Sequence, residues 1–346
     1  MRVAVAMSGG VDSSVVAGLM ARAGHEVIGI TLQLYDHGAA TARKGACCAG
    51  QDIYDAKRVA DRLGIAHYVV DSEARFKKSV MSAFADSYAA GETPVPCIAC
   101  NQHLKFGDLL EMARDFGAEA MATGHYVRRL EGPDGAEMHQ AVDLNRDQSW
   151  FLFATTREQL DFCRFPLGDY ASKAEVRAVA AEMGLAVAEK ADSQDICFVP
   201  SGSYAGIVEK FRPDALETGE VVTEDGRVLG SHQGIARYTI GQAKRLPDAA
   251  AHMVVKKIEP GTRRIIVGPR SNQSAIVRLR DVNWLVEPQE WRAEVKLRAR
   301  DMLRPASVVP KGAGAVLMLD EPALATPGQA AVFYNGTRIL GGGFII

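Results

Sequence analysis

The stretch MSGGVDSS at residues 7–14 decides the fold of the first half of this chain. It follows a short apolar run at residues 2–7 and leads into a helix-compatible run that ends at Gly24. Two adjacent glycines let the backbone turn tightly and approach a ligand, and the amides at a following helix N-terminus attract an anion. A Walker A loop would carry a lysine after its glycines, and this loop does not. The stretch therefore predicts a strand, an anion-binding turn and a helix.

Strands and helices alternate beyond this loop. The apolar run at residues 26–34 predicts a second, buried strand, and the run at 66–70 predicts a third strand. The apolar residues of 52–64 recur at helical spacing. A further helix is expected to begin near Gln102, followed by a strand at 118–125 that carries a glycine at its carboxyl end. Such alternation indicates βαβ units around a parallel sheet, with ligands at the carboxyl ends of the strands.

Length and composition place the chain among ordinary globular proteins with more than one domain. It has 346 residues, of which 47% are hydrophobic and 24% charged, which excludes disorder, collagen and coiled coil. No apolar run approaches the ~20 residues of a membrane span, and the N-terminus lacks the apolar core of a signal peptide. We therefore expect a cytoplasmic protein with no membrane partner. From about residue 215 onward, short β-rich runs predict antiparallel sheets or a small barrel.

Charge is unevenly distributed along the chain. The formal net charge is only −2, but residues 256–311 are strongly basic, whereas residues 1–255 are acidic on balance. A basic segment on an acidic protein lets one face bind a polyanion while the rest stays soluble. Five basic residues of this segment are candidates for phosphate contacts, namely Arg292, Lys296, Arg298, Arg300 and Arg304.

The six cysteines of a cytosolic chain this long are better explained as thiols, metal ligands or redox residues than as structural disulfides. Cys97 and Cys100 form a C-x-x-C pair in a proline-stiffened loop, just before the expected helix. A helix N-terminus stabilises a nearby thiolate, so Cys100 is a candidate nucleophile or ligand. Cys197 stands near the end of the strand-like run ICFV. A structural role as small hydrophobes is favoured for Cys47, Cys48 and Cys163.

The glycine loop resembles the PP-loop of ATP pyrophosphatases, which hold the pyrophosphate portion of ATP and join AMP to a substrate oxygen. Its serines add hydroxyl donors. Asp12 either holds Mg²⁺ or orders the loop, and the sequence does not choose between these roles. The loop alone leaves amide-forming ligases, such as the argininosuccinate, GMP and NAD synthetases, as candidates.

Longer motifs narrow the choice. In chain order they are SGGVDSS (8–14), TPVPCIACNQHLKF (93–106), ATGHY (122–126), RDQSWFLF (146–153), KADSQDICFVP (190–200), GSHQGIARYTIGQ (230–242) and TPGQAAVFYNG (326–336). They resemble the successive motifs of the bacterial tRNA-specific 2-thiouridylase family and cover nearly the whole chain.

The resemblance implies an α/β fold of three parts. They are an N-terminal parallel-sheet PP-loop domain (adenine nucleotide alpha hydrolase-like) at 1–202, a small central tRNA-contacting domain at 203–268 and a C-terminal antiparallel β-barrel at 269–346. It also implies a sulfurtransferase that installs sulfur at carbon 2 of the wobble uridine of tRNA.

The resemblance also implies a residue set for each role. Those implied for ATP with Mg²⁺ are Ala6, Met7, Ser8, Gly9, Gly10, Val11, Asp12, Ser13, Leu32 and Gly124. Those implied for tRNA are Val95, Pro96, Cys97, His125, Arg146, Asp147, Gln148, Arg298, Ala299 and Gln329. Two positions depart from the family, because Cys97 replaces a frequent aspartate and Ala299 a frequent tyrosine. Arg298, with Arg300, would then carry that barrel contact.

The implied chemistry uses two thiols. The oxygen at carbon 2 of uracil is a poor leaving group. Adenylation attaches AMP to it, so that the oxygen can leave as part of AMP. A persulfide on Cys197, loaded by a persulfide or sulfur-carrier donor protein, then delivers sulfur by direct attack or as hydrosulfide. The nucleophile Cys100 ends in a transient disulfide with Cys197. A stacked uridine is reachable only if extruded, so we expect a base-flipping pocket near Cys97 and Cys100.

Three alternatives stay open. Cys97, Cys100 and Cys197 could instead hold three irons of a [4Fe–4S] cluster whose fourth iron binds sulfide, or zinc together with Cys47 or Cys48. A PP-loop amide ligase acting on a small molecule would leave these cysteines unexplained. A non-catalytic RNA-binding module would leave the intact SGGVDSS unexplained.

Overall fold

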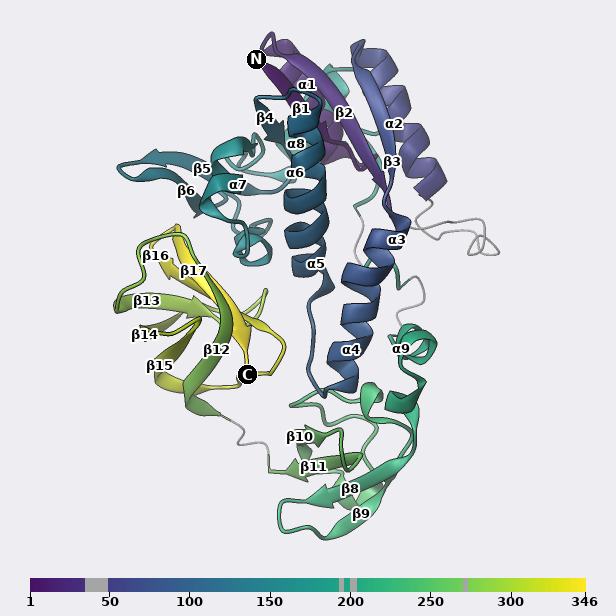
Figure 1. The fold of residues 1–346 in the computed structure, drawn as a ribbon, viewed down its shortest axis with the longest axis vertical. Helices are drawn as coiled ribbons and strands as arrows, with labels where there is room; N and C mark the ends of the chain where they lie inside the picture. The colour runs from purple at the N-terminus through teal and green to yellow at the C-terminus, as the bar shows by residue number, and fades with distance from the viewer. Residues whose placement is uncertain (35–48, 193–195, 200–203, 270–272) are drawn as a thin grey trace. The chain divides into compact units, whose positions relative to one another are not determined.

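The computed structural model describes residues 1–34, 49–192, 196–199, 204–269 and 273–346. The described residues form two compact units (Figure 1). Unit 1 comprises Met1–Ser79, Cys97–Pro200 and Gly336–Ile339; unit 2 comprises Val80–Pro96, Ser201–Asn335 and Leu340–Ile346. Each unit therefore combines segments that are far apart in the sequence.

Unit 1 is built around a parallel sheet, as the alternation of strands and helices predicts. The strand order is β3-β2-β1-β4-β7. The strands are β1 (Arg2–Ala6), β2 (Glu26–Gln33), β3 (Ala66–Asp71), β4 (Ala120–Ala122) and β7 (Cys163–Arg164). β1 lies between β2 and β4, and Val3 and Val5 are fully buried in it. Burial on both faces of the sheet explains why this strand is a continuous apolar run.

Helices pack on this sheet. The longest are α1 (Val11–Arg22), α2 (Ala49–Leu63) and α8 (Lys173–Glu182). α1 approaches the end of α8 so closely that a Cβ on Gly18 would lie 2.3 Å from the sulfur of Met183. The shorter helices of unit 1 are α3 (Glu73–Phe76), the 3₁₀ helix η3 (Ser149–Leu152) and α7 (Arg157–Phe162). The π-helix η1 (Lys77–Ser82) begins in unit 1 and ends in unit 2. A hairpin of β5 (Val127–Gly132) and β6 (Gly135–Gln140) follows β4.

The helical run that carries Cys100 differs from the expectation. It consists of α5 (Pro96–Ala99), the π-helix η2 (Cys100–Asp108) and α6 (Leu109–Asp115). The predicted helix start near Gln102 is therefore wrong, because Pro96 already opens the helical conformation, as proline favours in a first turn. Cys100 consequently lies inside the helical run.

The run ICFV around Cys197 is also not a strand. Residues 196–199 form a turn in which the Val199 amide donates to the Ile196 carbonyl at 2.9 Å. Phe198 packs edge-on against Phe76, with ring centroids 5.6 Å apart. Phe198 and Val199 are thus buried although the run is a turn and not a strand.

Unit 2 contains a mixed sheet and a barrel. The mixed sheet has the order β10-β11-β8-β9, with β8 (Gly219–Thr223), β9 (Val228–His232), β10 (Val254–Glu259) and β11 (Arg264–Gly268). The expectation of purely antiparallel pairing is wrong here, since β11 and β8 are parallel. Helices α4 (Ala83–Ala89) and α9 (Ala205–Phe211) belong to the same unit, with short 3₁₀ turns at Pro213–Leu216, Ile235–Arg237 and Asp248–Ala250.

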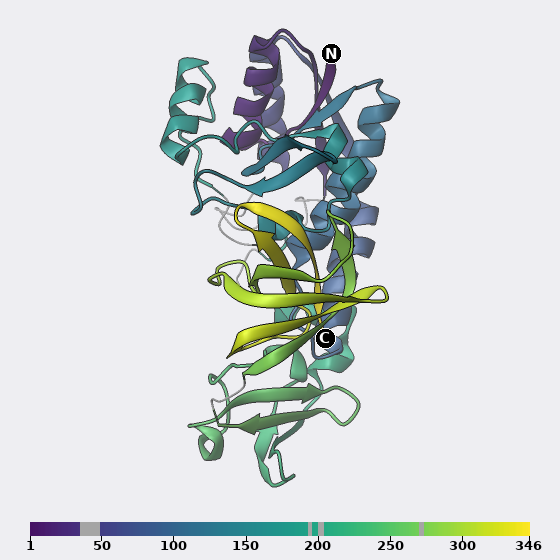
Figure 2. The same ribbon diagram turned by 90° about the vertical axis from the view of Figure 1, so that its left-hand side faces the viewer.

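The last strands form a closed antiparallel barrel, as expected (Figure 2). They are β12 (Ser274–Trp284), β13 (Trp291–Lys296), β14 (Arg304–Lys311), β15 (Gly314–Ala323), β16 (Ala330–Asn335) and β17 (Arg338–Ile345). The order β12-β15-β14-β13-β16-β17 closes through pairing of β12 with β17. Among the described helices, none has both the length and the apolar character that crossing a membrane requires.

Candidate active site

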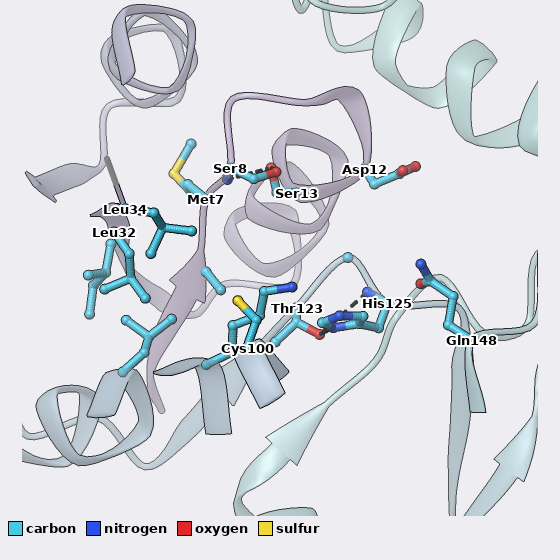
Figure 3. Close-up of a pocket in the computed structure, with 15 residues that line it drawn as sticks. Met7, Ser8, Asp12, Ser13, Leu32, Leu34, Cys100, Thr123, His125 and Gln148 are labelled. Carbon is cyan, nitrogen blue, oxygen red and sulfur yellow. Dashed lines mark hydrogen bonds between the residues drawn. The ribbon is translucent and has the colours of Figure 1, made fainter. Parts of the chain in front are cut away.

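A cavity of about 230 Å³ opens in unit 1 at the carboxyl ends of β1, β2 and β4, where ligands of parallel sheets bind. Its described lining residues are Ala6, Met7, Ser8, Asp12, Ser13, Ile30, Leu32, Leu34, Cys100, Lys105, Leu109, Thr123, Gly124, His125 and Gln148. Leu32 and Leu34 form one side, Asp12 and Gln148 lie on the other, and Cys100 lies between them (Figure 3). The cavity thus joins the glycine loop to one of the two predicted thiols.

The glycine loop is shaped by its own hydrogen bonds. The Ser8 amide donates to the Ser13 hydroxyl oxygen at 3.1 Å, and the Ser14 hydroxyl donates to the Gly10 carbonyl at 2.8 Å. Gly9 has a φ of +74°, and a Cβ there would lie 2.1 Å from the Asp52 carbonyl oxygen. Glycine is therefore required at this position both by conformation and by space.

Asp12 orders the loop through a partly buried ion network. Its carboxylate accepts from the Lys173 ammonium at 2.7 and 2.6 Å and from the Tyr126 hydroxyl at 2.7 Å. Lys173 also pairs with Asp192 at 3.0 Å. We call these residues the Asp12–Lys173–Asp192 network. Burial together with the hydrogen bond to Asp12 strongly raises the pKa of Tyr126, so it remains a donor.

The segment that leads to Cys197 is held to the same loop. The Lys190 ammonium donates to the Gly9 carbonyl at 3.0 Å and pairs with Asp52 at 2.7 Å and Asp55 at 2.6 Å. Asp192 is bound by Lys173 and also by Arg146 at 2.7 Å and Arg177 at 3.3 Å. Burial opposes ionisation of Asp192, but the ion pairs outweigh it and lower its pKa.

The three predicted sulfur residues lie in unit 1 and act on one another electrostatically. Cys100 is buried, whereas Cys97 and Cys197 have exposed surface. Desolvation raises the pKa of all three thiols. Neighbouring thiols add to this effect at Cys97 and Cys197 and bring the pKa of Cys197 to about 12. The charge of Lys105 opposes the increase at each of them. The expected stabilisation of the Cys100 thiolate by a helix N-terminus is therefore wrong here, because burial dominates.

The thiols are not arranged as a metal site. Within the described residues, which include Cys97, Cys100 and Cys197, no three His, Cys, Asp or Glu side chains are grouped so that they could hold a metal ion. The additional zinc ligands suggested, Cys47 and Cys48, lie outside the described residues. As placed, these residues do not fit a [4Fe–4S] or zinc site.

His125 is a neutral wall of the cavity. It is enclosed by protein, and burial lowers its pKa well below the usual value, with the charge of Lys105 acting in the same direction. Its Nδ1 lies 2.9 Å from the Thr123 hydroxyl. The imidazole can therefore form hydrogen bonds but carries no charge at neutral pH.

Several residues implied for tRNA have structural partners. Asp147 accepts from the Ser149 hydroxyl at 2.7 Å and from the Ala141 amide at 3.1 Å. Gln148 lines the cavity and accepts from the Tyr126 amide at 2.9 Å. These contacts anchor the turn between the hairpin and η3.

The remaining implied tRNA residues belong mainly to unit 2. Val95 and Pro96 precede Cys97, and the Gln329 amide donates to the Thr93 carbonyl at 2.9 Å. In the loop after β13, Arg298 and Arg300 are exposed and Ala299 is half-buried.

Two of the candidate phosphate-contacting residues in the basic segment are already paired. Arg292 forms a two-armed pair with Asp320, and Arg304 pairs with Asp301.

Sequence reasoning missed Lys105, Tyr126, Lys173 and Lys190. Lys105, Tyr126 and Lys190 lie inside the motifs given above, and membership of a motif could have identified them as candidate site residues. Lys173 begins α8 with no motif around it that indicates a site.

The fold and the cavity define a class of protein, a nucleotide-binding α/β domain with a glycine-rich loop and nearby thiols, followed by two β domains. Residues 1–201 match the family described as tRNA methyl transferase HUP domain. Residues 206–269 match the tRNA methyl transferase PRC-barrel domain, and residues 274–345 the aminomethyltransferase beta-barrel domain.

Curated relatives cover the whole chain. A tRNA-specific 2-thiouridylase MnmA of Acidiphilium cryptum is 67% identical over 100% of both chains. That of Gluconobacter oxydans is 63% identical over 100% of this chain and 99% of the relative. Among solved structures, an NMN synthetase from Francisella tularensis is 18% identical, with a TM-score of 0.35, covering 61% of this chain and 76% of that chain. The chain belongs to the tRNA-specific 2-thiouridylase family.

Proposed function

We propose that this protein catalyses ATP-dependent 2-thiolation of the wobble uridine of tRNA. The observation that carries the proposal is the single cavity that brings the glycine loop and Cys100 together. Adenylation and sulfur transfer act on neighbouring atoms of one base, so both groups must reach one site. The family relatives, which are named tRNA-specific 2-thiouridylases, support the same activity.

ATP binds in this proposal between the glycine loop and the apolar side of the cavity. The amides and hydroxyls of residues 8–14 face the phosphates, since a helix N-terminus favours an anion, and Leu32 contacts the adenine side. Asp12 is committed to Lys173 and Tyr126, which favours loop ordering over direct binding of Mg²⁺. Mg²⁺ supplies charge neutralisation to the phosphates when it is bound.

Sulfur transfer then uses Cys197 and Cys100. The uridine oxygen at carbon 2 displaces pyrophosphate from the α-phosphorus and becomes an AMP leaving group. The terminal sulfur of the Cys197 persulfide attacks carbon 2, and AMP departs. The Cys100 thiolate attacks Sγ of Cys197, which breaks the sulfur–sulfur bond, leaves sulfur on the base and forms the Cys100–Cys197 disulfide. A dithiol reductant restores both thiols, and a persulfide donor protein reloads Cys197.

tRNA binding completes the proposal. The uridine is extruded towards Cys97 and Cys100, and His125, Arg146 and Gln148 border its path. Exposed Arg298 and Arg300 contact phosphates, within a domain arrangement of 1–202, 203–268 and 269–346.

The test measures two half-reactions of cysteine variants. Cys100→Ser and Cys197→Ser should each abolish 2-thiouridine, measured by mass spectrometry of digested tRNA, while tRNA-dependent release of pyrophosphate in the adenylation step persists. Cys163→Ala is the matched control, because this buried thiol lies in β7 outside the cavity. Thiolation retained in Cys100→Ser or Cys197→Ser would contradict the assigned roles. ATP turnover that depends on a small amine instead of tRNA would favour an amide ligase. Absence of ATP turnover in the presence of tRNA would favour a non-catalytic RNA-binding module.

A further inference from the structure

The cavity contains one unpaired cation among its described lining residues. Lys105 lines it together with Ser8 and Ser13 of the glycine loop. Its ammonium makes no ion pair or hydrogen bond with any residue in the described part of the chain. Half-buried lysines are usually paired, because an isolated ammonium loses solvation without compensation. An unpaired lysine facing a cavity therefore points to an anionic ligand.

Three other titratable groups line the cavity, and none competes for this cation. Burial raises the pKa of the Cys100 thiol, so it is uncharged at neutral pH. Asp12 is held by Lys173 at 2.6 Å and by the Tyr126 hydroxyl. His125 is neutral, because burial lowers its pKa well below its usual value. The positive charge of Lys105 is therefore available to a bound molecule.

The π-helix η2 sets the position of this charge. The Leu109 amide donates to the carbonyl of Leu104, five residues before it. In an α-helix of about 3.6 residues per turn, a residue five positions on is rotated by about 140°, whereas i→i+5 bonding brings it back over the starting residue. The π conformation thus places Lys105 on the same face of the helix as Cys100, and both line the cavity.

The charge of Lys105 also acts on the thiols. Its charge lowers the pKa of Cys97, Cys100 and Cys197 against the larger effect of burial, and it also acts on His125. These groups approach the cation from α5 and η2, from the 196–199 turn and from the loop after β4. Lys105 therefore acts on the thiols from the same cavity that it lines together with the glycine loop.

We propose that Lys105 is a catalytic residue that binds the α-phosphate of ATP and keeps that contact in the adenylated uridine. This inference rests on the proposed function. The α-phosphate is the phosphate that stays through both half-reactions, and it is bonded to the oxygen on the carbon that the sulfur attacks. A cation that lines one cavity with the glycine loop and Cys100 matches that position. It stabilises the negative charge that develops on AMP as the carbon–oxygen bond breaks.

The experiment compares ligands that differ only in phosphate. Equilibrium dialysis of the full chain without tRNA measures Kd for adenosine, AMP and ATP. Lys105→Met should raise Kd for AMP and for ATP by the same factor, about tenfold, as expected for the loss of one charge-assisted hydrogen bond. Kd for adenosine should not change. Lys105→Arg should restore most of the loss. Lys57→Met, which removes an exposed ammonium from α2, is the matched control and should change none of the three.

Three results would overturn the inference. The first is unchanged AMP binding in Lys105→Met. The second is weaker binding of ATP alone, which would place the cation at the β- or γ-phosphate. The third is an equal weakening of adenosine binding, which would indicate a structural role. Lys105→Gln provides a second neutral variant if the methionine variant does not fold. These measurements use nucleotides alone, so they test the contact separately from the proposed function. If the wild-type protein binds AMP through Lys105 but does not thiolate tRNA, the proposed function is contradicted and the contact is not.

Discussion

Replacing Lys173 by methionine should destabilise unit 1 strongly, because it leaves two carboxylates without their shared cation. The Lys173 side chain is only 10% exposed, and its ammonium lies 2.6 Å from Asp12 and 3.0 Å from Asp192. Removing one partner of a buried ion pair costs about 3–5 kcal/mol of unfolding free energy. We expect the lower end, about 3 kcal/mol, since Asp192 keeps Arg146 and Arg177.

Thermal unfolding by circular dichroism measures this loss. About 3 kcal/mol corresponds to a decrease in Tm of about 6–12 °C for a domain of this size. The Asp12→Asn change, made in the Lys173→Met background, should recover part of it, because it removes one uncompensated charge. Lys57→Met, which is exposed, should leave Tm unchanged. A Tm decrease below about 2 °C in Lys173→Met, or strictly additive effects in the double variant, would refute the reasoning.

Four further predictions follow from the same structure. Gly9→Ala should raise Kd for ATP at least about tenfold, since its Cβ would lie 2.1 Å from a carbonyl oxygen, whereas Gly24→Ala, strained at a similar φ but in open space, should not. Burial keeps the pKa of His125 in the folded state below its value in the unfolded state, so stability that is present above about pH 6.5 is lost as pH falls. Urea titrations at several pH values measure how the free energy of unfolding changes with pH, and His125→Asn should reduce that slope by up to about 1.4 kcal/mol per pH unit. Arg298→Met should reduce the slope of log tRNA affinity against log salt by about 0.7–0.9, whereas Arg292→Met, whose cation is already paired, should change it less. Protein purified without oxygen should hold no stoichiometric iron or acid-labile sulfide, since its three thiols are not grouped as metal ligands; about four irons per chain would contradict this.

Apolar runs predicted β1, β2, β3 and β4 of the parallel sheet but not the two-residue β7. β1 and β2 were predictable because they are covered on both faces and need uninterrupted apolar sequence. This signal is weak for β14, whose run RPASVVPK contains two prolines, and for β17, whose run RILGGGFI contains three glycines. Barrel closure stabilises these strands through pairing with neighbours, which local propensity does not reveal.

The candidate site also contains residues that the sequence predicts and residues that it does not. The loop residues were predictable because they are contiguous and their chemistry is local. Lys173 was not, because its contact with Asp12 spans 161 positions in the sequence. The π-helix was not predictable either, since the pattern of residues 102–117 fits an ordinary α-helix. That difference in helical geometry is what places Lys105 on the face of Cys100.

The ion contacts beneath the cavity explain why two distant motifs occur in one chain. Lys173 joins the loop carboxylate of Asp12 to Asp192, and Lys190 joins the Gly9 carbonyl to α2. Asp192 and Lys190 both belong to the motif at 190–200, which contains Cys197. The loop that binds ATP in our proposal and the segment that carries sulfur are therefore fixed to each other by cations that neither motif alone reveals. A sulfur atom must reach a carbon next to the α-phosphate, and a direct structural connection between the two segments is the simplest way to keep that distance constant.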